Sequence, residues 1–338
     1  IKFQEIFNSY GSTAILMNVN SGEIISMVSI PDFDLNKRED ISDKKFINRS
    51  TKGVYELGSV FKTFTLAAGL QQNVIQEDTL FKNLPKKIKC AGRSISEYDM
   101  DIPSSLTAEE ILIRSGNIGS IKIAQKVGLE NFKDFLENLD LLNKIQFDIE
   151  EVGNPIPFKW GKCKLATSAY GHGITTTPLQ LAKAYAIIAN GGYKIKPTLI
   201  KKEKNLKRGE QIITQENSNK INEILRKIVT SEQGTANLAN IAGYEIAGKT
   251  GTAQKSIKGK YSKKKINTFA SIFPISSPKY VLIVLLDEPK LSETYIYEYN
   301  DGKKRKIIGT PFNTAGWTSV EVAKNIIEKI GPILAIKY

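Results

Sequence analysis

The chain has 338 residues, 41% of them hydrophobic, which is enough to bury a core in one large domain or two ordinary ones. It carries 48 Lys and Arg against 35 Asp and Glu, a formal charge of +13 that suits anionic surroundings. The composition excludes a disordered chain, and the longest apolar run, 280–286, is far shorter than the roughly 20 residues that span a bilayer.

The beginning of the chain is predicted to start a sheet. Two apolar, β-prone runs, 13–19 and 23–30, flank Asn20-Ser21-Gly22, which is typical of a hairpin. Ahead of them, 3–8 is a candidate covering helix. After a polar stretch, an apolar pattern predicts a helix over 59–70, which Ser59 would begin.

The middle of the chain, from about 106 to 229, is dominated by helical patterns and is predicted to be a mainly α-helical block. Helix start and stop signals occur within it: a capping box of Thr107 and Glu110, Thr177-Pro178 at a helix start, and Gly191-Gly192 at a helix end.

Strand patterns return near the end, at 244–254, 268–273 and 280–286, and an amphipathic helix over 320–330 is predicted to cover one sheet face. Between the first two strands, 255–265 is predicted to be a lysine-rich loop. Strands at both ends with helices between them imply one sheet with a long helical insertion and a cleft between the two parts. We expect 1–75 and 240–338 to form a sheet subdomain and 76–239 a mainly helical one.

The basic residues are scattered in clusters that we expect to lie in loops on a solvated face. The clusters lack interleaved aromatic residues and a nucleic-acid motif, so nucleic acid is not an expected partner. They are Lys86, Lys87 and Lys89; Lys201, Lys202 and Lys204; 263–265; and 303–306.

Cys90 and Cys163 are too few for a disulfide framework and, with the single histidine His172, for a zinc site. No metal is expected, and the redox state of the two thiols is left open. The chain starts without a signal peptide or an initiator Met. An excised piece that lacks an anchoring segment is therefore favoured over a cytosolic protein.

Three short motifs occur in order: Ser59-Val60-Phe61-Lys62, Ser115-Gly116-Asn117 and Lys249-Thr250-Gly251-Thr252. Each alone is weak, because a serine at a helix start is most often an N-cap and a Ser-Gly-Asn stretch is often an interhelical turn. On a helix, however, Ser59 and Lys62 project from the same face one turn apart. A neutral Lys62 amine could then activate the Ser59 hydroxyl as a nucleophile. The helix N-terminus and Lys249 would lower the pKa of Lys62 and stabilise a developing oxyanion.

A rival motif overlaps the third one. Residues 243–250 fit G-x-x-x-x-G-K-T, the phosphate-binding P-loop, and 282–288 resembles a Walker B strand. A P-loop needs a helix directly after its Lys-Thr pair, whereas 251–265 is polar, lysine-rich and followed by another strand. We interpret the match as accidental. No G-x-S-x-G motif occurs, and His172 is the only histidine available for a catalytic triad, so a structural role is favoured for it.

Together the three motifs resemble the S-x-x-K, S-x-N and K-T-G set of penicillin-binding proteins and serine β-lactamases. Nearly the whole chain resembles class B penicillin-binding proteins, with the likeness clearest at 54–59, 171–180 and 248–254. Asn48-Arg49 and 314–317 resemble the division-septum type, and the elongation type is the near neighbour.

The resemblance implies an α/β (α+β) fold of the penicillin-binding-protein and serine β-lactamase type, with an antiparallel sheet flanked by helices and an all-α subdomain inserted between the sheet halves. It implies a transpeptidase domain over 1–338. Relatives carry a cytoplasmic tail, a membrane helix and a pedestal domain ahead of this region. The expected location is the periplasmic face of the bacterial inner membrane.

The resemblance also implies residue roles. Ser59 would attack the penultimate D-alanine carbonyl of a stem peptide, with Lys62 as base and the backbone N–H groups of Ser59 and Thr252 as oxyanion hole. Ser115 would relay a proton to the departing D-alanine, and Asn117 would bind the substrate amide. Lys249, Thr250, Gly251 and Thr252 would dock the peptide on a strand edge, with the hydroxyls and the ammonium facing its terminal carboxylate.

The implied partners are donor and acceptor stem peptides, β-lactam antibiotics and division-machinery membrane proteins, including a glycosyltransferase for lipid-linked precursors, and no cofactor is implied. Alternatives remain open. A serine β-lactamase or D,D-carboxypeptidase of the same fold is the nearest, although the E-x-x-L-N glutamate of class A β-lactamases does not occur between Asn117 and Lys249. A P-loop NTPase and a non-catalytic cell-wall scaffold are more distant.

Overall fold

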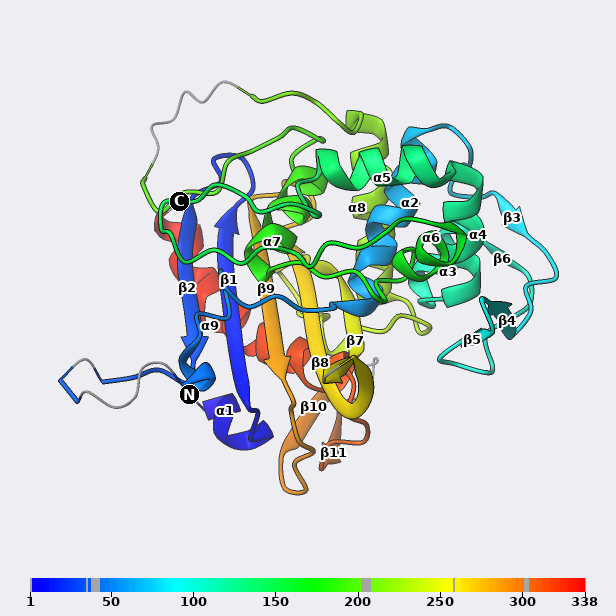
Figure 1. The fold of residues 1–338 in the computed structure, drawn as a ribbon. Coiled ribbons are helices and arrows are strands. Elements are labelled where there is room, and N and C mark those ends of the chain that lie inside the picture. Colours follow the sequence, from blue (N-terminus) through cyan, green and yellow to red (C-terminus); the bar gives the residue numbers. More distant parts are fainter. Residues whose placement is uncertain are drawn as a thin grey trace.

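The structure is a computed structural model that describes residues 2–34, 36–37, 43–201, 208–257, 259–300 and 304–337 (Figure 1). In these ranges the main sheet has five antiparallel strands in the order β2-β1-β9-β8-β7. Their bounds are β1 Gly11–Asn18, β2 Ile24–Ile30, β7 Ala247–Ile257, β8 Lys260–Phe273 and β9 Tyr280–Asp287. The predicted N-terminal hairpin is confirmed, and it joins the C-terminal strands through β1 and β9.

The centre of the sheet is β9, in which every residue is buried. A strand that is apolar on both faces needs a cover on each side. Figure 1 shows α7 (Pro178–Ala189) and α9 (Ser319–Lys337) on opposite faces of the sheet, with α1 (Lys2–Phe7) near the N-terminal strand. The C-terminal helix predicted to cover a sheet face is therefore confirmed.

The remaining helices gather around the β7 end of the sheet, toward the right of Figure 1. They are α2 Lys62–Gln71, α3 Ala108–Ile113, α4 Asn117–Val127, α5 Leu129–Asn138, α6 Lys162–Ser168 and α8 Gln215–Thr230. The Thr107–Glu110 capping box starts α3, and Thr177 with Pro178 starts α7, as predicted. Although α7 belongs to the range 76–239, it packs on β1, β8 and β9, so the predicted subdomain boundaries remain a prediction.

Short strands and 3₁₀ turns complete the fold. The strands pair as β3 (Leu80–Phe81) with β6 (Leu106–Thr107), β4 (Lys87–Cys90) with β5 (Arg93–Ser96), and β10 (Ile296–Asn300) with β11 (Lys304–Ile308). The 3₁₀ turns are η1 Lys44–Phe46, η2 Gly58–Phe61, η3 Asn237–Ala239 and η4 Ala315–Trp317. A disulfide between Cys90 and Cys163 joins β4 to α6.

The prediction that the basic clusters lie in loops was wrong for most of the described residues. Lys87 and Lys89 lie on β4, 263–265 on β8 and 304–306 on β11, while Lys202, Lys204 and Lys303 lie outside the described residues. The described residues of the lysine-rich segment 255–265, which leave out Lys258, lie at the far end of the β7–β8 ribbon rather than in a loop. Cross-strand pairs such as Ser256 with Tyr261 continue the backbone hydrogen bonding there, while the side chains of Lys260, Lys263 and Lys264 are exposed.

In the described part of the chain, no helix is both long and apolar enough to cross a membrane.

Candidate active site

The cleft

A cavity of about 710 Å³ opens between the helical group and β7, the edge strand of the main sheet. The three sequence motifs come together at this cavity. Ser59, Ser115, Asn117, Thr250 and Thr252 contribute to its wall. The sequence-predicted residues outside that wall are Lys62 and Lys249, which are buried beneath it at 1% and 0% exposure, and Gly251.

Position of the serine

Ser59 lies in the 3₁₀ turn η2, and the α-helix begins three residues later at Lys62, so the prediction that Ser59 starts the α-helix was wrong. Two glycines explain the turn. Gly58 has φ of +62°, which an L side chain rarely adopts. Gly251 lies so close to the turn that a Cβ there would be 2.2 Å from the Leu57 carbonyl oxygen. Tight contact with β7, rather than helix propensity, therefore sets the backbone at Ser59.

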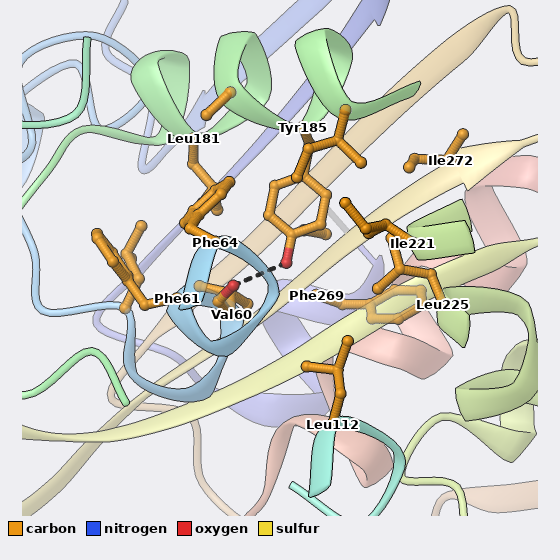
Figure 2. Packing of buried hydrophobic residues seen from close by; sticks show 14 of the residues in the cluster. Val60, Phe61, Phe64, Leu112, Leu181, Tyr185, Ile221, Leu225, Phe269 and Ile272 are labelled. Atoms are coloured by element: carbon orange, nitrogen blue, oxygen red, sulfur yellow. Dashed lines mark hydrogen bonds between the residues drawn. The ribbon is translucent and has the colours of Figure 1, made fainter. Parts of the chain in front are cut away.

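The turn rests on a fully buried aromatic cluster (Figure 2). Phe61 and Phe64 meet edge to face, and Phe64 meets Tyr185 of α7 in the same way. The Tyr185 hydroxyl donates to the Val60 carbonyl at 2.9 Å, the dashed line in Figure 2. Because tightly packed interiors resist small displacements, this cluster fixes the half-buried Ser59 side chain at the cleft.

The two lysines and Ser115

Lys62 donates from Nζ to the backbone oxygen and to Oγ of Ser115, the latter at 3.2 Å. No hydrogen bond from Lys62 Nζ to Ser59 Oγ occurs among the described residues. Burial lowers the pKa of Lys62 to about 7, although the negative charge of Glu97 acts in the opposite direction. A substantial neutral fraction of Lys62 is thus available near neutral pH.

Lys249 donates from Nζ to Ser115 Oγ at 2.9 Å and to the Thr250 carbonyl at 3.2 Å. Burial holds the pKa of Lys249 well below its usual value, and the nearby charge of Lys62 lowers it further. Low-dielectric surroundings oppose two like charges so close together. The two lysines are therefore expected to carry a combined charge below +2 near neutral pH.

The Ser115 hydroxyl accepts hydrogen bonds from both lysines. The Ser115 backbone itself is strained. Its φ is +59°, in the left-handed region that non-glycine residues rarely occupy. Such strain often persists at functional sites, where surrounding contacts hold it. Here the turn between α3 and α4 presents the Ser115 hydroxyl to both lysines.

The strand edge

Thr250 and Thr252 face the cleft from the side of β7 opposite Lys249, because side chains alternate along a strand. Thr250 Oγ1 lies 2.6 Å from Thr235 Oγ1, and Thr252 Oγ1 accepts from the Ala315 N–H at 2.9 Å. The Lys249 ammonium reaches Ser115 Oγ, which lines the same cleft, and a carboxylate facing both the hydroxyls and the ammonium stays a prediction. In the main sheet β7 pairs only with β8, so its other edge faces the cleft side and can accept an extended peptide.

Residues that the sequence did not indicate

Glu97 is a buried acid at the cleft that no motif indicated, with 7% exposure. Its carboxylate accepts from the backbone N–H groups of Asn117 at 2.5 Å and Ile118 at 2.8 Å, and so caps the start of α4. The Asn117 side chain donates to the Ser96 carbonyl at 2.9 Å. The β4–β5 segment therefore positions Asn117, through residues about 20 positions away in the sequence.

A second unpredicted group lies at the other end of the cleft. The His172 ring packs against Tyr261 with centroids 4.4 Å apart, and the Tyr261 hydroxyl donates to Glu56 at 3.1 Å. Glu56 also accepts from the Gly173 N–H at 2.8 Å. The hydrogen bonds described for the chain include none between His172 and Ser59, so a Ser-His-Asp triad is not formed.

The P-loop interpretation is excluded, because β7 continues through Lys249-Thr250 to Ile257 and no helix follows the pair. In the described ranges no group of three His, Cys, Asp or Glu side chains is arranged to hold a metal ion.

Comparison with known proteins

A family described as "Penicillin binding protein transpeptidase domain" matches residues 12–313. A Caulobacter vibrioides protein named "Probable peptidoglycan D,D-transpeptidase FtsI" is 32% identical over 99% of this chain and 56% of its own length. The Escherichia coli K12 "Peptidoglycan D,D-transpeptidase FtsI" is 30% identical over 84% of this chain and 48% of its own length. The chain thus spans about half the length of these relatives.

Among solved structures, the transpeptidase domain of Burkholderia pseudomallei penicillin-binding protein 3 superposes with a TM-score of 0.82 and 24% identity, covering 98% of this chain and 91% of that one. This likeness concerns the fold. It confirms the expected mixed α/β class, with an antiparallel sheet flanked by helices.

Proposed function

Since the chain belongs to the penicillin-binding protein transpeptidase domain family, we propose that it is a peptidoglycan D,D-transpeptidase domain with Ser59 as its nucleophile. The observation that carries the proposal is the convergence of Lys62 and Lys249 on Ser115 Oγ beside the cleft that Ser59 lines. Shared burial of two lysines is costly, and perturbed buried cations of this kind cluster at functional sites.

Acylation starts with attack of Ser59 Oγ on the penultimate D-alanine carbonyl of a stem peptide. The neutral Lys62 amine takes the serine proton, after its flexible stem turns from Ser115 toward Ser59. The backbone N–H groups of Ser59 and Thr252 stabilise the oxyanion. Close packing of β7 on the 57–60 turn supports a joint oxyanion hole of these two N–H groups. A Cβ on Gly58 would lie 3.1 Å from the Thr252 carbonyl oxygen.

Release of D-alanine needs a proton on its nitrogen. Ser115 Oγ delivers that proton and is resupplied by Lys62 or Lys249, both of which donate to it. Asn117 hydrogen-bonds the substrate amide, and Thr250, Gly251 and Thr252 align the peptide on the free edge of β7 with its carboxylate at the two hydroxyls. An amine from a second stem peptide then attacks the acyl-enzyme, returns its proton through the same groups and frees Ser59.

The setting of this reaction is also a proposal. The names of the two relatives support a role in septal cell-wall synthesis during division. We place the domain at the periplasmic face of the inner membrane, with division-machinery membrane proteins as partners, among them a glycosyltransferase for lipid-linked precursors. β-Lactams acylate Ser59 as mimics of the donor.

The test is labelling with a fluorescent penicillin, followed by incubation with a D-Ala-D-Ala donor and an amine acceptor. Wild type and the control Ser104→Ala, an exposed serine outside the cleft, should label, and Ser59→Ala should not. A cross-linked product supports transpeptidation. Rapid turnover of the penicillin indicates a β-lactamase, and water as the only acceptor indicates a carboxypeptidase. No adduct on a folded wild type would contradict the proposal and favour a scaffold.

A further inference from the structure

A second cavity, of about 890 Å³, adjoins the cleft and has no role in the chemistry described above. Its walls are the β4–β5 hairpin, the start of α6 and the tip of the β7–β8 ribbon. The Cys90–Cys163 disulfide lies in its wall and holds the hairpin to α6. Tyr170 and His172 line both cavities, so the two spaces are neighbours across these rings.

The second cavity is positively charged. Its described lining includes Arg93, Lys164 and Lys260 and no acidic residue. Lys164 is the inner cation, since its Nζ donates to the Gly173 carbonyl and lies 3.8 Å from the Phe158 ring centroid. Arg93 and Lys260 are exposed at the rim. Cations gathered in one concave site attract an anionic group.

The acid next to this cavity is already engaged. Glu56 accepts from the Gly173 N–H and from the Tyr261 hydroxyl, and it lies 3.9 Å from His172 Nδ1. Its position lies at the boundary with the cleft, outside the lining of the second cavity. Arg93 and Lys260 are thus left available for a ligand carboxylate, whereas Lys164 is held by the Gly173 carbonyl and feels the charge of Glu56.

The direction of β7 connects the two cavities. A donor peptide whose carboxylate end lies at Thr250 and Thr252 extends along the free edge of β7 toward Ser256. An extended peptide advances about 3.3 Å per residue along the strand. Ser256 pairs with Tyr261 across the ribbon, and Tyr261 packs on His172. The donor residues that precede the acylating D-alanine therefore approach the rings that border the second cavity.

We propose that the second cavity binds a carboxylate carried by the donor stem peptide upstream of the acylating D-alanine. Arg93 and Lys260 at the rim make the contacts, Lys164 behind them adds positive charge, and the disulfide keeps the hairpin wall in place. This inference rests on the transpeptidase function proposed above. It assigns the cavity a part in donor selection, whereas Ser59, Lys62 and Ser115 perform the chemistry.

The test compares two donor pentapeptides that end in D-Ala-D-Ala and differ only in the third side chain, with a free carboxylate in one and its amide in the other. Release of D-alanine without an added acceptor reports acylation. The variant is Arg93→Gln with Lys260→Gln. Its matched control is Lys122→Gln with Lys126→Gln, which removes the same charge from exposed positions on α4 outside both cavities.

Because partly exposed ion pairs contribute modestly, wild type and control should acylate with the free carboxylate about three- to tenfold faster than with the amide, and the variant should lose most of this preference. An equal preference in all three proteins, or none in wild type, would overturn the inference. A charge effect confined to reactions with an added acceptor peptide would assign the cavity to the acceptor and equally overturn it.

A small fluorescent penicillin without a second carboxylate separates this inference from the proposed function. Equal labelling of wild type, variant and control shows intact Ser59 chemistry, so that a lost donor preference belongs to the second cavity. Failure of all three to label would instead contradict the transpeptidase function itself.

Discussion

Lys249 Nζ donates a 2.9 Å hydrogen bond to Ser115 Oγ, although the two residues lie 134 positions apart in the chain. The same hydroxyl accepts from Lys62 Nζ at 3.2 Å. One oxygen atom thus joins residues of the three sequence motifs. A buried network of this kind is stable only while every member is satisfied, so a change at one member should affect the others.

The pH dependence of acylation should report Lys62. A neutral Lys62 base makes the penicillin acylation rate rise with pH, with an apparent pKa near the value of about 7 that burial gives this amine. The charge of Glu97 raises the pKa of Lys62, so Glu97→Gln should move the rising limb to lower pH. Stopped-flow acylation across pH 5 to 10 measures the shift; the control Glu130→Gln, an exposed acid on α5, should leave the limb unchanged. An upward shift would contradict the assignment of Lys62.

Lys62 should weaken the fold at neutral pH. Its pKa is lowered in the native state, so the unfolded chain binds more protons at any pH between about 7 and its ordinary value of 10.5. The loss of folding stability that comes from burying the charged Lys62 amine is full below about pH 7 and fades as the pH rises toward 10.5. Lys62→Met should therefore raise Tm at pH 7 by several degrees, and by less at pH 9.5, while acylation falls about 10²- to 10⁴-fold. A lower Tm at pH 7 would show that the buried amine stabilises the fold.

Gly251→Ala should disrupt the contact between β7 and the serine turn. The added Cβ would meet the Leu57 carbonyl oxygen at 2.2 Å, a contact that the backbone can relieve only by moving. We expect a loss of about 1 to 3 kcal/mol of stability, as for overpacking, together with at least a tenfold slower acylation. Gly161→Ala is the matched control, since its φ of 174° is extended and no atom lies within 4 Å of its Cβ position. Equal effects of the two substitutions would contradict close packing at Ser59.

The disulfide should stabilise the fold by closing a long loop, because Cys90 and Cys163 are 73 residues apart. Cys163→Ser should lower the free energy of unfolding by about 2 to 4 kcal/mol, as seen in urea titrations. Wild type treated with a reductant should match the variant, and the variant should not respond to reductant. An unchanged wild-type midpoint after reduction would show that the two thiols are not paired.

Features encoded by neighbouring residues could be predicted from the sequence. The 13–30 hairpin, the capping box at Thr107, the helix start at Thr177-Pro178, and the amphipathic C-terminal helix each depend on signals a few residues apart. The three motifs likewise indicated the residues of the candidate site, because their order and types carry the resemblance. How these residues lie relative to one another could be seen only in the folded structure.

Features decided by distant contacts could not be predicted. The 3₁₀ turn at Ser59 depends on the close approach of Gly251, which propensity does not encode. Glu97 caps a helix 20 residues away, and the partner of Cys90 lies beyond five elements of the chain. The lysine-rich ribbon at 255–265 has loop-like composition, yet cross-strand pairing resumes there after a register shift between Gln254 and Ser256.

The most direct test of the central claim is peptide mapping of the penicilloyl adduct by mass spectrometry. After brief treatment with penicillin, acid quenching and digestion, a single modified site is expected, on Ser59. Ser115→Ala should carry the adduct on the same serine but form it more slowly. An adduct on any other residue, or none on a folded protein, would contradict the assignment of Ser59 as the nucleophile.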